Sequence, residues 1–219
     1  MNSAALFDGL LDYVFLIIVI TFHEFGHAWA SWKLGDDTAR MQGRITLNPV
    51  AHMELIGTVV LPLLAIFLRS SAPALSGFII GWGRPVPVNP MLLRRGKFDE
   101  MLVAMAGPMM NVLVALFVMA VARGGYLMHQ EFVIEPCFRL AMLSMFLCFF
   151  NLLPIPPLDG SHVLKFVVGM SYEAFWRFSQ FGILIVLVVL QMQPVQTLLR
   201  GSTMKSLGLM AWLFRFPIA

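Results

Sequence analysis

The chain has 219 residues, of which 59% are hydrophobic and only 12% are charged, and its formal net charge is +3. A soluble globular domain carries about 25% charged residues. The composition excludes a disulfide-rich secreted domain, a nucleic-acid binder and a disordered chain, and it predicts an integral membrane protein.

Four apolar runs are long enough to cross a bilayer, for which about 20 residues are needed. In chain order they cover residues 9–31, 101–122, 137–157 and 178–199. The apolar tail is shorter, so we expect it to lie at the membrane interface or to pack on the bundle. The predicted fold is an all-α polytopic bundle of about four to six transmembrane segments, forming a single membrane-embedded domain over residues 1–219.

The stretch 55–83 is apolar, but a proline and several small residues interrupt it, and neither half is long enough to span comfortably. We expect it to be a re-entrant hairpin or two short crossings. Two segments beside it, Met41–Leu47 and Trp82–Val88, roughly alternate apolar and polar residues, which predicts a small β-hairpin or sheet. Pro85 and Pro87 would confine the second strand to an edge. Such an edge could pair with the backbone of an extended peptide.

The first apolar run contains HEFGH, with His23, Glu24 and His27. Two histidines at i and i+4 project from one face of a helix, one turn apart, and can bind the same zinc ion. Glu24 is placed to act as a general base on an attacking water. Ionisable groups inside an apolar run are costly and usually functional. The pattern therefore predicts a metal site within the membrane.

A catalytic zinc usually takes three protein ligands and leaves one position for water, so a third ligand is expected. Most acidic residues lie in polar segments or too far down the first helix, and two candidates remain, Glu54 and Asp159. Asp159 is favoured because it ends the proline-rich run NLLPIPPLDG, residues 151–160, and irregular backbone at membrane depth lines a wet cavity or is buried in protein. His52 and His162 are weaker candidates, more typical of residues around a site than of ligands.

These motifs resemble those of the site-2 protease family, the intramembrane zinc metalloproteases of peptidase family M50. HEFGH fits the family's HExxH, and NLLPIPPLDG fits its NxxPxxxLDG. Residues 106–111, AGPMMN, resemble a third conserved stretch that opens the middle core helix, and GRITLNPVAH is similar to the compact prokaryotic branch. The family's regulatory PDZ and CBS domains have no counterpart in this chain.

The resemblance implies one zinc ion held by His23, His27 and Asp159, with Glu24 as the general base. It also makes Asn151 a candidate donor to the oxyanion or to the substrate backbone, whereas a role for Asn111 stays open. The implied activity is that of a metalloendopeptidase that cleaves transmembrane or membrane-proximal segments of membrane proteins, as in regulated intramembrane proteolysis.

Two other functions compete with this reading. A non-proteolytic zinc-binding membrane protein, such as a pseudoprotease or a sensor, would not need Glu24, which is present. A metal transporter would place polar residues along several helices, and the runs 101–122 and 178–199 contain almost none. The protease interpretation accounts for the ionisable residues better than either alternative.

The ligand set constrains the topology. Zinc requires both histidines and Asp159 at one depth, so the helices over 9–31 and 137–157 must run parallel, with 101–122 as the return crossing. Residues 32–100 then begin and end on one side of the membrane. With 55–83 re-entrant, 10 of the 15 Lys and Arg residues lie on that side, and the positive-inside rule assigns it to the cytoplasm. We expect a multi-pass protein of the cell (inner) membrane whose active site opens toward the cytoplasm.

Overall fold

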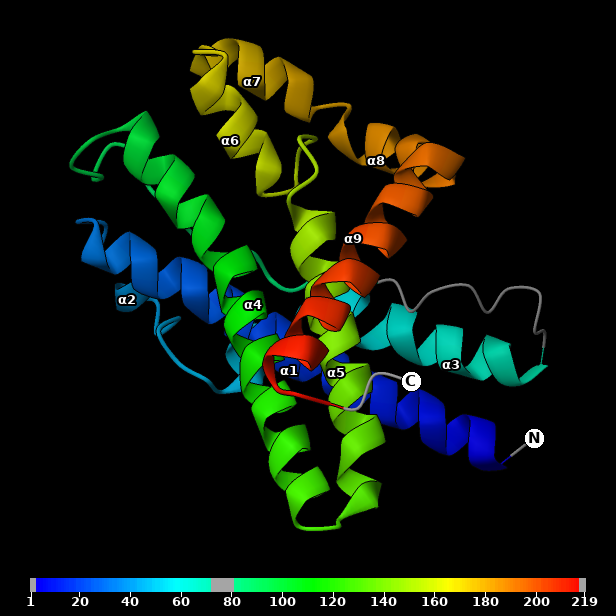
Figure 1. The fold of residues 1–219 in the computed structure, drawn as a ribbon. Helices are drawn as coiled ribbons and strands as arrows, with labels where there is room; N and C mark the ends of the chain where they lie inside the picture. The colour runs from blue at the N-terminus through cyan, green and yellow to red at the C-terminus, as the bar shows by residue number, and fades with distance from the viewer. Residues whose placement is uncertain (1–2, 72–80, 217–219) are drawn as a thin grey trace.

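A computed structural model of the chain describes residues 3–71 and 81–216 (Figure 1). The helices it contains are α1 (Ser3–Lys33), α2 (Thr38–Met41), a 3-10 turn (Pro49–Ala51), a π-helix (Leu55–Val60), α3 (Leu61–Ser71), α4 (Lys97–Leu127), α5 (Glu131–Asn151), α6 (Gly160–Val167), α7 (Tyr172–Ser179), α8 (Gly182–Gln191) and α9 (Gln193–Leu213).

Three of these helices are long and apolar enough to cross a membrane: α1 from Leu6 onward, α4 and α5. A fourth crossing is formed if α7 and α8, which are bent by 58° relative to each other, count as one broken span. The prediction of an all-α fold is confirmed for residues 3–71 and 81–216, whereas three or at most four candidate spans are found there, against the four to six that were predicted. The predicted single helix over 178–199 is wrong, because α8 ends at Gln191 and α9 starts anew at Gln193. Pro194 in the first turn of α9 cannot continue a preceding helix.

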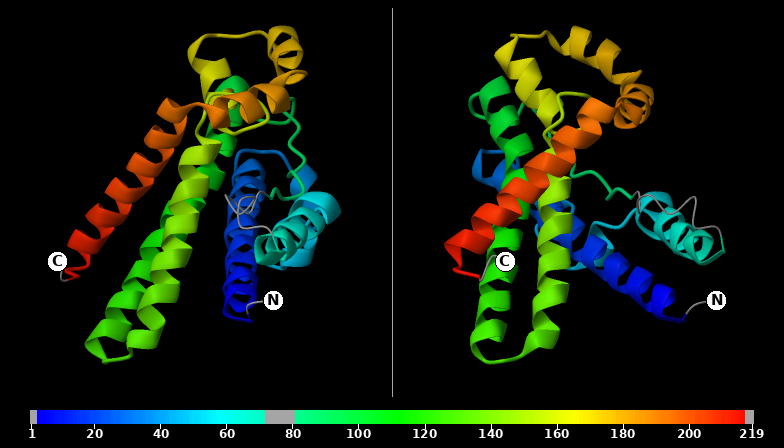
Figure 2. Two further views of the ribbon diagram at one scale, coloured as in Figure 1. Left: turned by 90° about the vertical axis from the view of Figure 1, so that its right-hand side faces the viewer. Right: turned by 45° about the vertical axis from the view of Figure 1, so that its right-hand side comes forward.

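The core is built by α1, α4 and α5 (Figure 2). Figure 2 shows the C-terminal ends of α1 and α5 on the same, upper side of the molecule, and α4 running back the other way, although α1 is steeply inclined to α5 in the right-hand view. The ends of α1 and α5 that carry or precede the metal-site motifs therefore lie on one side, as expected. Buried side chains of the three helices form the main cluster, which includes Phe15, Val19, Met119 and Met145. α9 joins this cluster through Leu207 and Met210, so the described part of the apolar tail packs on the bundle.

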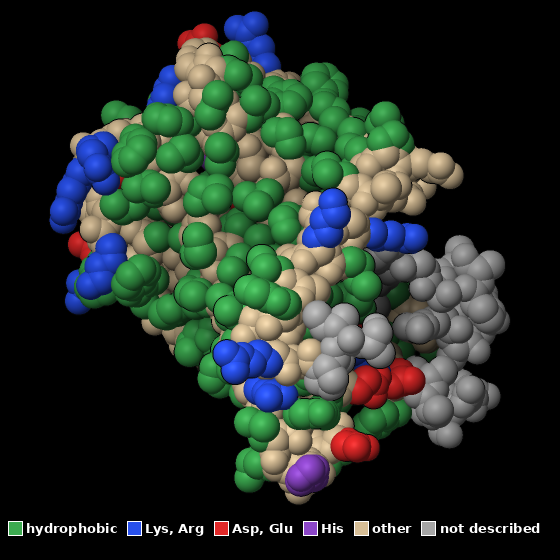
Figure 3. Space-filling model, viewed as in Figure 1, with side chains coloured by type: hydrophobic (Ala, Val, Ile, Leu, Met, Phe, Trp, Pro, Cys, Tyr) green, Lys and Arg blue, Asp and Glu red, His purple; other side chains and the backbone are tan. Residues whose placement is uncertain are grey.

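The outside of the bundle remains apolar. The face in Figure 3 is covered largely by hydrophobic side chains, with several Lys and Arg side chains at its upper and left edges. Phe117, Phe132, Leu184 and Val188 are among the large hydrophobic residues left exposed. So many exposed large hydrophobic side chains are characteristic of a protein that contacts lipid, although a few Lys and Arg side chains also lie within this face.

The two predicted strands are wrong: within 3–71 and 81–216 no residue is in a β-strand. The end of α2 and a turn at Gly43, which has φ +67°, take up the first segment. Residues 81–89 are in no helix or strand. Arg84 N donates to His52 O at 2.7 Å, and the Arg44 side chain donates to the carbonyls of Arg84 and Pro85, both at 2.9 Å. A side chain therefore takes the place of a neighbouring strand.

Only part of the expected re-entrant region can be compared with the structure. Residues 55–71 form the π-helix and α3, and the apolar part, Leu55–Phe67, is shorter than a spanning helix. α3 lies beside α1, where a side chain on Gly9 would lie 2.9 Å from Ile66. Residues 72–80 lie outside the described part of the chain.

Candidate metal centre

Both histidines of HEFGH point from α1 toward the same place. They are one turn apart on a continuous helix, and each is only 8% exposed. His27 Nε2 lies 3.1 Å from His23 Nε2. Two nitrogens bound to one tetrahedral zinc at about 2.0–2.1 Å would be about 3.3 Å apart. The histidines are therefore already spaced as ligands of one ion.

Asp159 completes the group from the far end of the chain. It lies directly before α6, at the end of the proline-rich loop that follows α5. Its Oδ2 is 3.1 Å from His23 Nε2, and its Oδ1 is 3.4 Å from His27 Nε2. Within the described residues, these three are the only His, Cys, Asp or Glu side chains whose ligand atoms gather closely enough to hold a metal ion, all within 4.8 Å.

α4 orients the histidine rings. His27 Nδ1 donates to the carbonyl of Val103 at 2.8 Å, so in the neutral ring Nε2 carries the lone pair. This outer hydrogen bond is the usual way in which a protein fixes the tautomer of a metal-binding histidine. Gly107, one turn further along α4, allows close approach, because a Cβ there would lie 2.3 Å from His27 Nε2 and 2.7 Å from His23 Cε1.

The donor set fits zinc. In the neutral tautomer the lone pair of His27 Nε2 faces a carboxylate oxygen at 3.4 Å, an arrangement that repels unless a proton or a cation lies between them. Two imidazole nitrogens and one carboxylate oxygen are the ligands of catalytic zinc sites, which keep a fourth position for water. The site therefore has the chemistry and the spacing for one such ion.

Glu24 lies beside the irregular segment 81–89. A Cβ on Gly83 would lie 3.2 Å from Glu24 Oε1 and 2.7 Å from Ile20 Cγ2, so only glycine lets the chain pass this close. Arg44, which is 4% exposed, donates hydrogen bonds to the carbonyls of Arg84 and Pro85, which follow Gly83. Burial lowers the pKa of the Arg44 guanidinium, and the charge of Arg84 lowers it further. The segment is thus fixed against the general-base candidate.

The other predicted residues lie outside the metal group. The Glu54 side chain accepts from Gly57 N at 2.6 Å and caps the π-helix, so it does not act as a ligand. His52 Nε2 contacts the carbonyl of Thr46, and His162 Nδ1 contacts Glu100. Asn151 Nδ2 donates to Leu147 O within α5, at 2.9 Å.

Asn111 is fully buried on α4, and its side-chain amide has no hydrogen-bond partner within the described residues. Its own carbonyl accepts from Ser144 on α5. The amide lies one turn beyond Gly107, on the same face of α4. These contacts establish a packing position between α4 and α5.

Sequence reasoning did not identify Val103, Gly107, Gly83 or Arg44. Val103 and Arg44 carry no local signal, because a backbone carbonyl contact and a clamp on a distant loop depend on tertiary packing. The glycines could have been suspected, since Gly107 lies in AGPMMN and Gly83 in the run GWG, where glycine is typical of close backbone approach.

Comparisons with known proteins find one matching family model and several relatives. The model of "Peptidase family M50" matches residues 121–192, which include Asp159. The "Putative zinc metalloprotease YwhC" of Bacillus subtilis is 32% identical over 191 residues, covering 83% of this chain and 81% of the relative. The "Putative zinc metalloprotease Rip2" of Mycobacterium tuberculosis H37Rv is 30% identical, covering 90% of this chain and 70% of the relative. No solved structure gives a significant match.

Proposed function

The chain belongs to peptidase family M50, and we propose that it is an intramembrane zinc metalloendopeptidase that cleaves transmembrane or membrane-proximal segments of membrane proteins. The observation that carries the proposal is the convergence of His23, His27 and Asp159 inside an apolar bundle. Glu24, on the same helix turn as His23, provides a general base, which a non-proteolytic zinc protein would not need.

In the proposed mechanism His23, His27 and Asp159 hold the ion. When bound, zinc supplies Lewis-acid chemistry, polarising the scissile carbonyl and lowering the pKa of a water molecule. Glu24 accepts the proton of the attacking water and passes it to the leaving amine. Asn151, at the end of α5, would exchange its bond to Leu147 O for one to the developing oxyanion.

A transmembrane substrate arrives as a helix and must unwind before its backbone can be attacked. Residues 81–85, which are in no helix or strand, offer a partner for the unwound backbone. Trp82 and Arg84 use their amides on Gly57 O and His52 O, whereas within the described residues no hydrogen bond engages the amide or carbonyl of Gly83. We propose that these groups pair with the substrate beside Glu24.

The function is tested with the purified chain in lipid vesicles. Its substrates are a single-pass transmembrane helix and a soluble peptide of polar sequence. We expect cleavage of the helix but not of the peptide, loss of cleavage after chelation, and recovery when zinc is restored. Asn151→Ala should lower kcat by about 10²–10³-fold, the typical cost of one oxyanion donor. Zinc binding without cleavage of any transmembrane substrate would favour a pseudoprotease.

We further propose that the protein forms a single multi-pass peptidase domain of the cell (inner) membrane, with its metal centre opening toward the cytoplasm. Trp32 is flanked by Lys33 and Arg40 at 4.1 and 5.3 Å from its ring, an arrangement typical of a membrane interface, at the end of α1 that carries the histidines.

Cysteine labelling tests this orientation, because Arg95 and His129 lie just beyond opposite ends of α4. In whole cells a membrane-impermeant thiol reagent should label His129→Cys and spare Arg95→Cys. Variants that also carry Cys137→Ser and Cys148→Ser remove background labelling. The reverse labelling pattern would show that the metal centre faces outward.

A further inference from the structure

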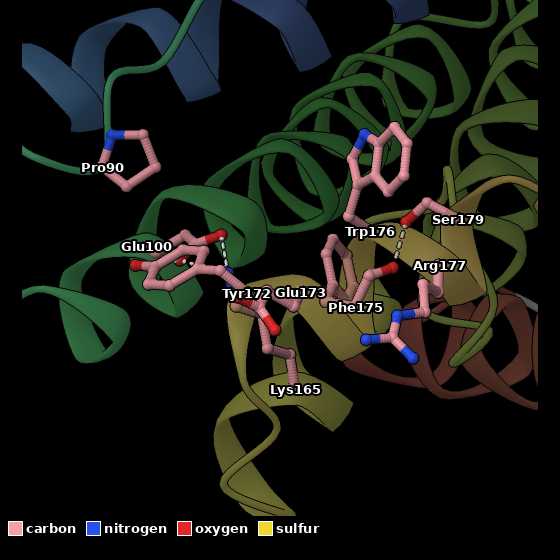
Figure 4. A pocket seen from close by; sticks show the side chains of 9 residues that line it. All are labelled: Pro90, Glu100, Lys165, Tyr172, Glu173, Phe175, Trp176, Arg177 and Ser179. Carbon is pink, nitrogen blue, oxygen red and sulfur yellow. Dashed lines mark hydrogen bonds and ion pairs between the residues drawn. The ribbon is translucent and has the colours of Figure 1, made fainter.

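A buried cluster of charged side chains lies between α4, α6 and α7, apart from the metal ligands (Figure 4). Lys165 Nζ donates to both carboxylate oxygens of Glu100, each at 2.8 Å. His162 Nδ1 donates to Glu100 Oε1 at 2.9 Å, and the Tyr172 hydroxyl donates to Oε2 at 3.2 Å. Lys165 is 2% exposed. Every polar partner in this cluster is therefore directed at one carboxylate.

Aromatic side chains of α7 cover the ion pair. Lys165 Nζ lies 3.6 Å from the ring centroid of Tyr172 and 4.9 Å from that of Phe175. A cavity of about 670 Å³ borders Glu100 and Lys165 on this side and is lined further by Trp176 and Arg177. Lys165 and Glu100 are themselves only 2% and 7% exposed, and this burial strengthens the attraction between their charges.

The same cluster fixes α6, the helix that follows Asp159 directly. His162 N donates to Asp159 O at 3.0 Å, and Lys165 lies three residues further on. At the start of α6, a Cβ on Gly160 would lie 2.2 Å from the carbonyl oxygen of Leu152. Asp159 is thus held between a close backbone contact to the end of α5 and an ion pair to α4.

α4 links this cluster to the histidines. Glu100, Val103 and Gly107 lie at spacings of three and four residues, on one face of the helix. Val103 O accepts from His27, and Gly107 packs against both imidazole rings. A shift of α6 along α4 would therefore move Asp159 relative to both other ligands.

We propose that the Glu100–Lys165 ion pair, with His162 and Tyr172, positions Asp159 for metal binding. The proposal rests on the proposed function, because it concerns the third ligand of the same site. A buried ion pair usually adds little net stability compared with a well-packed apolar pair. This one constrains geometry instead, since both carboxylate oxygens are satisfied only when α6 has one placement on α4. Residues that support metal ligands in this way typically alter metal affinity when they are replaced.

The test uses the full chain in detergent micelles and the double variant Glu100→Gln/Lys165→Met, which removes both charges and keeps the side-chain volumes. We expect it to fold with a melting temperature near that of the wild type, to bind zinc about 10–100-fold more weakly, and to lose kcat with little change in KM. Tyr172→Phe removes one hydroxyl from the cluster and should weaken zinc binding about two- to fivefold. If the double variant does not fold, the zinc affinity of Tyr172→Phe tests the proposal.

Arg139→Gln is the matched control, because Arg139 also joins two helices through ion pairs, to Asp8 at 3.0 Å and to Asp12 at 2.8 Å. Asp8 lies 15 residues before His23, about 22 Å along α1. This variant should lower the melting temperature and leave zinc affinity unchanged. Wild-type zinc affinity in both the double variant and Tyr172→Phe would overturn the positioning role alone. A wild-type chain that bound no zinc would overturn the proposed function and this proposal together.

Discussion

Gly107→Ala should abolish proteolysis although it changes the chain by one methyl group. The added carbon would lie 2.3 Å from His27 Nε2 and 2.6 Å from His27 Cε1, closer than any real contact, and α4 cannot move away from α1 without disturbing the core. The ring must therefore rotate away from its ligand position. Since a misplacement of about 1 Å can cost 10²-fold in rate, we expect at least a 100-fold loss of kcat/KM, together with weakened zinc binding.

Gly124→Ala is the control for this substitution. Gly124 lies in the same helix, and a Cβ there would meet nothing within 4 Å. Alanine is favoured over glycine inside a helix by about 0.5–1 kcal/mol, so this variant should be slightly more stable and fully active. Rates and zinc affinities measured side by side check the prediction. Normal zinc binding by Gly107→Ala would mean that the histidines do not meet at this glycine.

Glu24→Gln should retain zinc and lose activity. The substitution keeps the size of the side chain and leaves the three ligands in place, but an amide cannot accept the proton of the attacking water. General acid–base catalysis contributes about 10²–10⁴-fold, and the loss of kcat should fall in that range. The measurement is single-turnover cleavage of a transmembrane substrate by variant and wild type at matched zinc content.

Glu54→Gln provides the comparison, since Glu54 is the carboxylate that sequence reasoning left as a rival ligand. Its side chain caps the π-helix by accepting from Gly57 N, and glutamine retains an acceptor oxygen for that bond. Activity and zinc content should therefore stay close to those of the wild type. If both variants lost cleavage equally, the assignment of Glu24 as the general base and of Glu54 as a helix cap alone would be contradicted.

The candidate metal ligands are the part of the site that could be predicted from the sequence. The spacing of His23 and His27 places both side chains on one face of a helix, and α1 is a continuous helix through both. Asp159 follows His27 by 132 residues, yet its proline-rich surroundings identified it, because such backbone at membrane depth has few other roles. The shared ligand set also predicted that the C-terminal ends of α1 and α5 lie on one side of the molecule, as Figure 2 shows, although the two helices are steeply inclined rather than parallel.

The predictions that were wrong concern segments whose local sequence pattern disagrees with their tertiary contacts. Trp82–Val88 alternates like a strand, but its hydrogen bonds go to Arg44 and to a loop, which no periodicity can indicate. The run 178–199 is apolar throughout, and hydropathy alone concealed the break before Pro194. The support of Asp159 by Glu100 and Lys165 joins residues 65 positions apart, and ordinary polar residues near helix ends give no sign of such a pairing.

The central claim, that His23, His27 and Asp159 bind one zinc ion, is tested most directly by the zinc content of the purified chain and of Asp159→Ala, measured by mass spectrometry after dialysis against a weak chelator. The account predicts one equivalent of zinc in the wild type and essentially none in the variant. Retention of a full equivalent by Asp159→Ala, or its absence from the wild type, would contradict it.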